Sequence, residues 1–341
     1  MEHLNIVNLI QSGTITVGIL GGILLWKTYE YRGLSILLWL SAFASFINIL
    51  EESGLTRGVY LISPVFIMLF GPAIYLSTRF IIEKKLKPYE WFHFLPVIPF
   101  LLFTDHTQQV IALGTFWRLS YSLMTVSILI KFKRMLDDQR SDSDDYSLNW
   151  LAWLVAITST FTIIDLVRLN YQHSIAHELN VLGQGIQNTI WLISSMLITA
   201  KLIFQGEFVQ SEQVEENHIN KGKPSIVESE YSSIFSGLDE LIAINKWYLT
   251  PRLTLNDLSQ LTGLQSRDIS RAINLCKGIS FSEYINQYRV EHACHLIIKN
   301  PNMSLLDVAS EAGFSSKASY NKVFKQVTGK TPSGYKSEIA V

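Results

Sequence analysis

The chain opens with a succession of long apolar segments, and this feature constrains its fold more than any other. Five runs contain no charged residue and are 18 to 22 residues long: 5–26, 33–50, 58–78, 146–164 and 179–200. A sixth run, 108–130, is interrupted only by Arg118. A helix needs about 20 apolar residues to cross the hydrocarbon of a bilayer. The run lengths therefore predict a bundle of membrane-spanning helices within residues 1–205.

A seventh apolar segment, around 91–103, is short and contains Pro96 and Pro99. The distribution of charge favours counting it as a span. Cytoplasmic loops hold an excess of Lys and Arg. With seven spans and an outside N-terminus, nine basic residues fall in the inner loops and only Arg57 falls in the outer ones. The sequence thus predicts about seven spans in a bacterial-type inner membrane, with the C-terminal part in the cytoplasm.

Composition changes sharply after the last apolar run. Charged residues make up 17% of the chain, against about 25% in soluble domains, but residues 1–205 account for the deficit. Residues 206–232 contain six glutamates together with Gly206, Gly222 and Pro224, which predicts an acidic, flexible linker. Residues 233–341 have the mixed polarity of a soluble domain.

Within 233–341, a short capped helix that ends at a glycine occurs twice, at 254–263 and 304–313. Each is followed by a second amphipathic helix, beginning near Ser266 and near Ser316, and a longer helix at about 280–299 connects the two pairs. Such a pair forms a helix-turn-helix, whose second helix enters the major groove of DNA. The predicted fold class is all-α: a polytopic membrane helix bundle plus a C-terminal double helix-turn-helix domain.

Residues 233–338 resemble the AraC/XylS-type DNA-binding domain. The most specific stretch, 307–336, contains an Ala-Gly-Phe turn, a Phe-Lys pair and the ending Thr-Gly-Lys-Thr-Pro-Ser-Gly-Tyr. Residues 253–263 and 278–285 match the first half of the family pattern. The resemblance covers about three-tenths of the chain and implies a transcription regulator that binds double-stranded DNA. The whole chain resembles membrane-tethered one-component regulators in general layout.

By that resemblance, the two second helices are recognition helices that present eight residues to base edges: Arg267, Ser270, Arg271 and Asn274, then Lys317, Ala318, Asn321 and Lys322. The spacing agrees, because an inward-facing set of Ile269, Ile273, Tyr320 and Phe324 leaves these residues outside. Arg and Asn can bond guanine and adenine bidentately. Lys277, Lys325 and Lys330 are expected to contact phosphates. The alternative is that these are ordinary solvated helix faces.

The charge of the C-terminal domain is modest for a DNA-binding protein. From Thr250 onward there are 11 Lys and Arg residues against 7 Asp and Glu, while phosphate neutralisation supplies much of the affinity for DNA. A homodimer would double this charge, so paired sites are expected.

Charged residues inside the apolar runs are candidates for a sensor. Arg118 lies near the middle of its run, where a charge is costly and usually functional. We take Arg118 and Asp165 as candidate sensor residues for an unknown small molecule or membrane-protein signal; the alternative is a structural pair or a side chain that reaches the interface. The predicted outer loops are short, so a ligand would bind within the bundle or at its outer mouth.

Motifs for catalysis, cofactors or metals are not apparent in the sequence. It contains no Gly-rich phosphate loop and no HExxH motif, and the spacing of His173 and His177 is weak support for a metal. We therefore expect a protein that is not an enzyme and needs no cofactor. The main alternative is a membrane transporter or membrane enzyme with an appended autoregulatory DNA-binding domain. Gly18 and Gly22 form a small-xxx-small pair that can bring two helices close.

Overall fold

The computed structural model of the protein describes residues 6–56, 60–104, 106–172, 174–204 and 228–339. Within these ranges every regular element is helical, and the one strand-like feature is an isolated antiparallel bridge between Arg140 and Thr254. The predicted all-α fold class is confirmed. The chain forms two compact units: Met1–Ile130 with Leu148–Gln210, and Lys131–Ser147 with Ser211–Val341.

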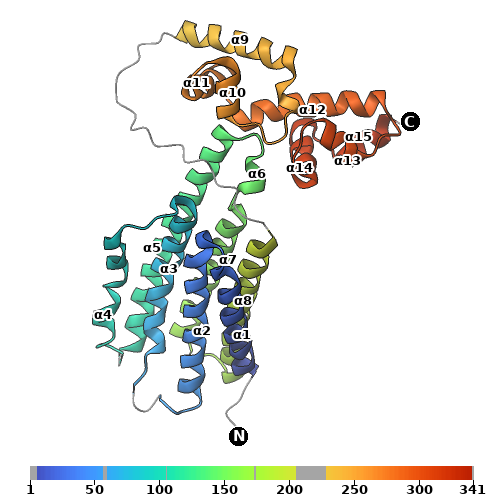
Figure 1. The fold of residues 1–341 in the computed structure, drawn as a ribbon. Helices are drawn as coiled ribbons and strands as arrows, with labels where there is room; N and C mark the ends of the chain where they lie inside the picture. Colours follow the sequence, from blue (N-terminus) through green and yellow to red (C-terminus); the bar gives the residue numbers. More distant parts are fainter. Residues whose placement is uncertain (1–5, 57–59, 105, 173, 205–227, 340–341) are drawn as a thin grey trace. The chain divides into compact units, whose positions relative to one another are not determined.

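The first unit is built from long helices. They are α1 (Ile6–Trp26), α2 (Arg32–Glu52), α3 (Phe66–Glu83), α5 (Thr107–Gln139), α7 (Asn149–Asn170) and α8 (His177–Phe204), and the last residues of α5 belong to the second unit (Figure 1). Among the described residues these six helices are long and apolar enough to cross a membrane. Short 3-10 helices lie at Tyr29–Tyr31 (η1) and Ser63–Val65 (η2).

The seventh predicted span does not form a long helix. Its residues fold into a 3-10 helix, η3 (Pro88–Phe94), and the short helix α4 (Val97–Phe100). Pro96 and Pro99 explain the break, because proline has no backbone N–H to donate and its ring clashes with the preceding turn. Figure 1 shows this segment running along the bundle from the end where α3 stops to the end where α5 begins. This segment therefore runs along the bundle as two short helical pieces and not as one long helix.

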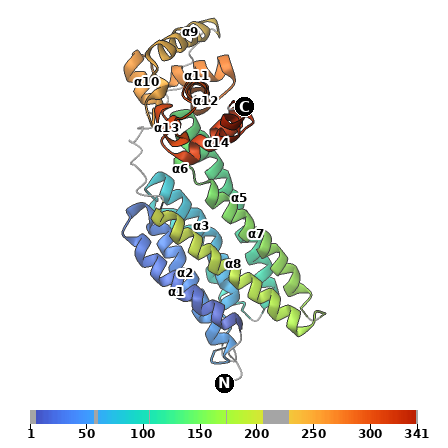
Figure 2. The same ribbon diagram turned by 90° about the vertical axis from the view of Figure 1, so that its right-hand side faces the viewer.

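The small-xxx-small pair lies at a helix contact within the chain. A Cβ atom on Gly18 would lie 2.7 Å from the carbonyl oxygen of Leu38 and 2.9 Å from the Cβ of Ala42. On Gly22 it would overlap the indole of Trp39. The two glycines thus let α1 approach α2, as expected for small residues between membrane helices. Helix α8 lies on another side of α1 and also contacts α7 (Figure 2).

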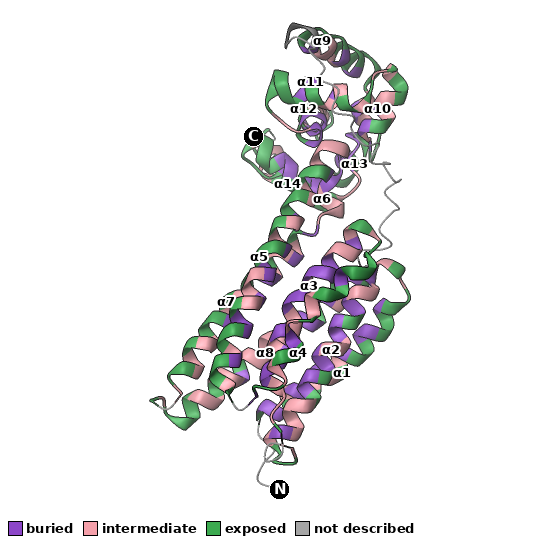
Figure 3. Cartoon of the chain, turned by 90° about the vertical axis from the view of Figure 1, so that its left-hand side faces the viewer, coloured by how far each residue is buried: buried purple, intermediate pink, exposed green. Residues whose placement is uncertain are grey.

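The helices of the first unit bury several polar side chains and expose many large apolar ones. On α1, Asn8, Gln11 and Thr14 are buried, whereas Leu9 and Leu20 are exposed. In α7 and α8, only 22% of the residues in the most apolar 18-residue stretch are buried. Figure 3 shows exposed residues along the length of α7. Apolar side chains point outward from this unit.

The second unit contains eight α-helices among its described residues besides the end of α5. They are α6 (Ser143–Tyr146), α9 (Glu228–Asn245), α10 (Leu255–Thr262), α11 (Ser266–Lys277), α12 (Phe281–Lys299), α13 (Leu305–Glu311), α14 (Lys317–Thr328) and α15 (Pro332–Ile339), with the 3-10 helix η4 (Trp247–Leu249). Helix α9 begins inside the predicted linker, so residues 228–232 are helical; 206–227 lie outside the described residues. Residues 131–147, assigned from the sequence to the membrane domain, belong to this unit.

Two apolar cores share the connecting helix α12. The first core holds Leu258 of α10, Ile273 of α11 and Ile285 of α12. The second holds Val308 of α13 and Phe324 of α14 together with Val290, Ala293 and Ile297 of α12. Each helix-turn-helix thus packs on one half of α12, which fixes the two recognition helices relative to each other.

Local sequence signals explain where these helices begin. Thr254 accepts a hydrogen bond from the backbone N–H of Asp257, and the Asp257 carboxylate accepts one from the N–H of Thr254. Ser280 and Glu283 form the same reciprocal cap at α12, and Ser316 caps α14. Such caps satisfy N–H groups that the first helical turn leaves without partners.

Candidate nucleic-acid interface

The predicted recognition helices, α11 and α14, turn their apolar sides to the two cores. Ile269 and Ile273 of α11 are buried, as are Tyr320 and Phe324 of α14. Of the residues predicted to read bases, Ser270 is half-buried and the other seven are exposed: Arg267, Arg271, Asn274, Lys317, Ala318, Asn321 and Lys322. The outward direction of each face is as predicted; contact of these residues with bases stays a prediction.

The three lysines expected at phosphates are also exposed. Lys277 ends α11, with its Nζ 5.6 Å from the ring centroid of Phe235. Lys325 lies in the last turn of α14, and Lys330, just beyond that helix, forms an ion pair with Glu338. Exposed contacts of this kind contribute little to stability. The lysines are therefore free to exchange their present neighbours for phosphates.

A buried arginine holds the two halves of the domain together. The guanidinium of Arg289, on α12, is almost completely buried and donates hydrogen bonds to the carbonyl oxygens of Tyr248 and Thr250, at 2.7 and 2.8 Å. It also donates to the Asn286 side chain at 3.2 Å. Burial lowers the pKa of Arg289 to about 10, although the negative charge of Asp142 acts to raise this pKa. The guanidinium supplies donors to two carbonyls of the segment that follows α9, one in η4 and one just after it.

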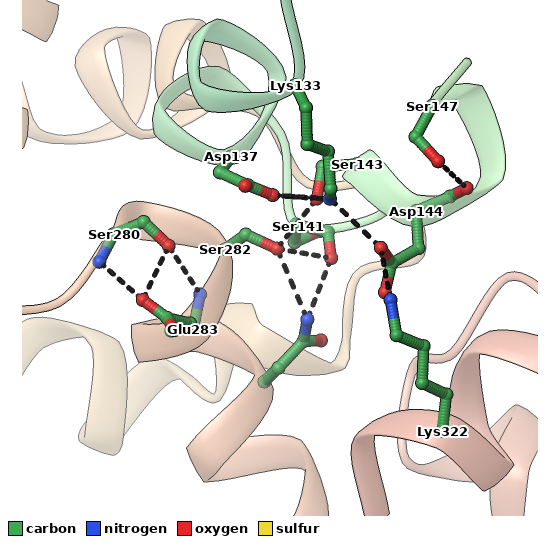
Figure 4. Close-up of polar contacts among 11 residues, drawn as sticks. Lys133, Asp137, Ser141, Ser143, Asp144, Ser147, Ser280, Ser282, Glu283 and Lys322 are labelled. Atoms are coloured by element: carbon green, nitrogen blue, oxygen red, sulfur yellow. Dashed lines mark hydrogen bonds and ion pairs between the residues drawn. The ribbon is translucent and has the colours of Figure 1, made fainter. Parts of the chain in front are cut away.

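An acidic carboxylate lies against the second recognition helix. Asp144 accepts a hydrogen bond at 2.8 Å from Lys322, and its other neighbour is Lys133 at 2.9 Å (Figure 4). Burial would raise the pKa of Asp144, but the hydrogen bonds and charges of Lys322 and Lys133 outweigh it and leave this pKa below its ordinary value. One residue predicted to read bases is thus engaged by the chain's own carboxylate.

The neighbouring carboxylate occupies the start of the same helix. Asp145 accepts hydrogen bonds from the hydroxyls of Ser315 and Ser316, at 2.7 and 2.8 Å. Ser316 is the N-cap of α14. Backbone N–H groups and the helix dipole favour an anion at a helix N-terminus. A DNA phosphate would find the same donors there.

Asp138 of the same segment lies near Asn274 of the first recognition helix: burial and the charge of Asp137 raise the pKa of the Asp138 carboxyl, and Asn274 opposes this rise. Between the two contacts, the backbone N–H of Ser141 donates to the carbonyl oxygen of Leu253 at 3.0 Å. The Ser141 carbonyl in turn accepts from Asn286 at 3.0 Å (Figure 4). Ser141, Asp142 and Ser143 are buried, so residues 131–147 are an integral part of the domain.

Sequence reasoning missed this acidic segment. It counted Lys131, Lys133, Arg134 and Arg140 as the basic residues of an inner loop. Residues 137–147, however, contain five aspartates and one arginine. That charge, opposite to the charge of the recognition helices, was the signal available in the sequence. It could not show which surface the segment contacts.

The two candidate sensor residues both line one cavity of about 1100 Å³ in the first unit. Asp165 forms an ion pair with Arg168 at 2.7 Å, which is the structural alternative considered for it. Arg118 is buried, and its guanidinium carbon lies 4.5 Å from the ring centroid of Trp191. The structure brings the two residues to one cavity without pairing them.

The cysteines and histidines form no metal cage in the part of the chain that the structure describes, where no group of three His, Cys, Asp or Glu could hold an ion. Cys276 is exposed and Cys294 half-buried, both as free thiols. His173 lies outside the described residues. The candidate site therefore consists of the exposed faces of α11 and α14, with the residues predicted to contact bases and phosphates.

Comparison with known families identifies the C-terminal part. Residues 258–338 match the family model described as "Helix-turn-helix domain". The region matched begins inside α10 and includes both recognition helices. The chain therefore carries a C-terminal helix-turn-helix DNA-binding domain of the AraC type.

Curated relatives share the same region. An "Uncharacterized HTH-type transcriptional regulator" of Staphylococcus aureus is 33% identical over 86 residues, which are 25% of this chain and 11% of the relative. The "Msm operon regulatory protein" of Streptococcus mutans is 30% identical over 87 residues, 26% of this chain and 31% of the relative. The chain thus spans between a tenth and a third of the length of these relatives. No solved structure matches it significantly. Over its DNA-binding domain the chain is similar to transcription regulators.

Proposed function

We propose that this protein is a membrane-bound, one-component, sequence-specific transcription regulator, in which the helix bundle senses a signal and controls DNA binding or dimerisation of the double helix-turn-helix. One observation carries the proposal. A single chain contains an AraC-type DNA-binding domain and six long helices with apolar outer faces.

The burial pattern of the first unit supports insertion in a bilayer. Leu9, Phe116 and Trp153 each expose 72% of their surface, on α1, α5 and α7 respectively. Exposed apolar faces of this extent are unfavourable in water, whereas lipid tails cover them at no cost. Helices also satisfy all backbone hydrogen bonds internally, as the hydrocarbon requires.

The distribution of basic residues supports a cytoplasmic C-terminal domain. Lys84, Lys85 and Lys87 follow α3, and Lys131 to Arg140 follow the apolar part of α5. Because η3 and α4 return the chain along the bundle between α3 and α5, these two groups of basic residues lie at the same end of the bundle. The positive-inside rule assigns that side to the cytoplasm, where DNA is available in a bacterium.

The recognition helices supply specificity and their flanks supply affinity. Arg271 and Asn321 have the donor geometry that reads guanine and adenine edges, and each lies on an exposed face. Lysines at the ends of these helices neutralise phosphates. A second copy of the chain would double the modest charge of one domain, so binding as a homodimer on paired sites is part of the proposal.

The experiment that tests this function uses the full chain in lipid nanodiscs. Duplexes retained from a random pool are sequenced after several rounds of selection. Enrichment of one motif, with two half-sites if the protein binds as a dimer, is the expected result. A pool that stays random would refute sequence-specific binding. Extraction of cell membranes with alkaline carbonate provides the second test, since release of the chain into the supernatant would refute membrane insertion.

A further inference from the structure

The cavity of the first unit, which four carboxylates also line, contains a buried cation that forms no ion pair with a described residue. Arg118 is 6% exposed and, among the described residues, its guanidinium makes no hydrogen bond and no ion pair. An arginine cannot lose its proton and carries five donors. Leaving such a group unpaired in a membrane interior is costly. The guanidinium of Arg118 therefore needs a hydrogen-bond acceptor, and none of the described residues provides one.

Three other charged residues that line the cavity have partners within the protein. Glu51 accepts hydrogen bonds from the backbone N–H groups of Ile62 and Ser63, at 2.7 and 3.0 Å. Asp165 and Arg168 pair with each other. These groups are structural, because their charges are already satisfied. Arg118 differs from these three residues, because no described residue forms an ion pair with it.

The surroundings of Arg118 favour an anion with an apolar part. Thr115, one turn earlier on α5, lines the cavity with a buried hydroxyl that has no hydrogen-bond partner in the described structure. Trp191 contributes a flat apolar surface beside the guanidinium. A volume of about 1100 Å³ is at the upper end of that of small-molecule sites.

We infer that this cavity binds an amphiphilic anion, whose carboxylate or phosphate lies against Arg118 and Thr115 and whose apolar part lies along Trp191. The inference rests on the proposed sensing role of the membrane unit and names the class of signal. Two sources share this chemistry: a free organic anion, and the headgroup of an anionic lipid that enters from the bilayer.

The test measures thermal unfolding of the full chain in nanodiscs of neutral phosphatidylcholine. Acetate, benzoate and octanoate are compared with equal concentrations of sodium chloride, and a second preparation replaces part of the lipid with phosphatidylglycerol. A saturating ligand should raise the unfolding midpoint by roughly 4 °C or more. A rise with a free carboxylate identifies a soluble ligand, and a rise with phosphatidylglycerol alone identifies a lipid.

The matched variants are Arg118→Met and Arg168→Met, which remove one positive charge each from the same cavity. Arg118→Met should abolish the rise, whereas Arg168→Met should keep it, because Arg168 already has a protein partner. Equal responses of the wild type and Arg118→Met, including no response to any probe, would overturn the inference. Because unfolding does not involve DNA, that result would leave the DNA-binding function standing.

A second and independent observation concerns the acidic segment 137–147 of the other unit. Its Asp144 accepts a hydrogen bond from Lys322 of α14, and its Asp138 lies near Asn274 of α11. Asp145 occupies the donors at the start of α14. These are contacts that bases and phosphates would make in a complex with DNA. Asp144 is held by two lysines and Asp145 by two hydroxyls, and a bound phosphate takes donors of both kinds.

We propose that segment 137–147 is an intramolecular competitor of DNA, which occupies Lys322 and the start of α14 until it is displaced. The segment directly follows the apolar part of α5, the helix that carries Arg118. Its attachment is built into the domain, since Ser141 and Ser143 are buried against Leu253 and Ser282. The proposal rests on DNA binding through α11 and α14.

The test compares DNA binding by the full chain and two double variants in nanodiscs. Asp144→Ala with Asp145→Ala removes the two contacts at α14. Glu240→Ala with Glu311→Ala makes the same change in charge at exposed residues of the second unit. The probe is a fluorescent 40-base-pair duplex of random sequence at low salt, which reports binding through phosphates.

The aspartate variant should bind the duplex about tenfold more tightly than the wild type, and the glutamate variant should gain much less. Equal gains would show that net charge alone acts, and no gain in either would show that the segment does not compete; both results overturn the proposal while leaving DNA binding intact. If none of the three proteins binds the duplex, the proposed function fails and the competitor proposal with it.

Discussion

Substituting Arg271 and Lys325 separately distinguishes residues that read bases from residues that contact phosphates. Both are exposed, on α11 and α14. The Arg271 guanidinium lies 5.4 Å from the ring centroid of the buried Tyr231, a contact whose loss costs the fold about 0.5–2 kcal/mol. Either side chain can thus be truncated without unfolding the domain, and the effect on binding reports on DNA.

The two variants should differ in kind. Arg271→Ala removes a bidentate donor, so it should cost about 1–3 kcal/mol on the selected operator and relax preference at one base pair. Lys325→Ala should weaken binding to operator and random duplexes alike. It should also reduce the dependence of log K on log salt by about 0.9, the value for one phosphate contact.

Fluorescence anisotropy of the full chain in nanodiscs, titrated at several salt concentrations, measures both quantities. The operator and a random duplex are run in parallel, with Lys299→Ala, on the connecting helix, as a control for a lost exposed charge. If Arg271→Ala and Lys325→Ala change the salt dependence and the base preference to the same extent, the assignment of the two faces is wrong.

Three further predictions follow from particular side chains. Arg289→Ala leaves two backbone carbonyls without donors, so it should destabilise the second unit by about 2–6 kcal/mol, seen as faster amide exchange in α12; unchanged exchange would contradict the role of this buried guanidinium. The pKa of Asp144 is lowered, so the contact of Asp144 with Lys322 should stabilise the fold above about pH 4 and be lost as the pH falls further. Thermal unfolding at several pH values measures this. A midpoint that already declines between pH 7 and 5 in the wild type, but not in Asp144→Asn, would contradict the prediction. Reporter fusions at residue 105 should read as external and at residue 341 as cytoplasmic, and an external signal at 341 would exclude access to DNA.

Much of the fold followed from patterns that act over a few residues. Apolar runs of about 20 residues predicted the six long helices, because the thickness of the hydrocarbon sets their length. Spacing of three and four predicted that Ile269, Ile273, Tyr320 and Phe324 would be buried, and therefore which faces of α11 and α14 point outward. The seventh segment was predicted as a span, and its two prolines left it as a broken helix.

The tertiary structure alone decided which distant groups meet. Segment 131–147 read as a basic inner loop, yet its aspartates lie against Lys322 and the start of α14. In the sequence, Gly18 and Gly22 indicated that α1 could approach another helix closely, but not which one. The structure shows that this helix is α2. The sequence showed Arg118 as a costly charge, but only the packing showed that it lines a cavity and that no described acid forms an ion pair with it. The spacing of apolar residues determines which face of a helix is buried, because the backbone fixes the number of residues per turn. The element that packs on that face depends on contacts between residues far apart in the chain, and the spacing contains no information about them.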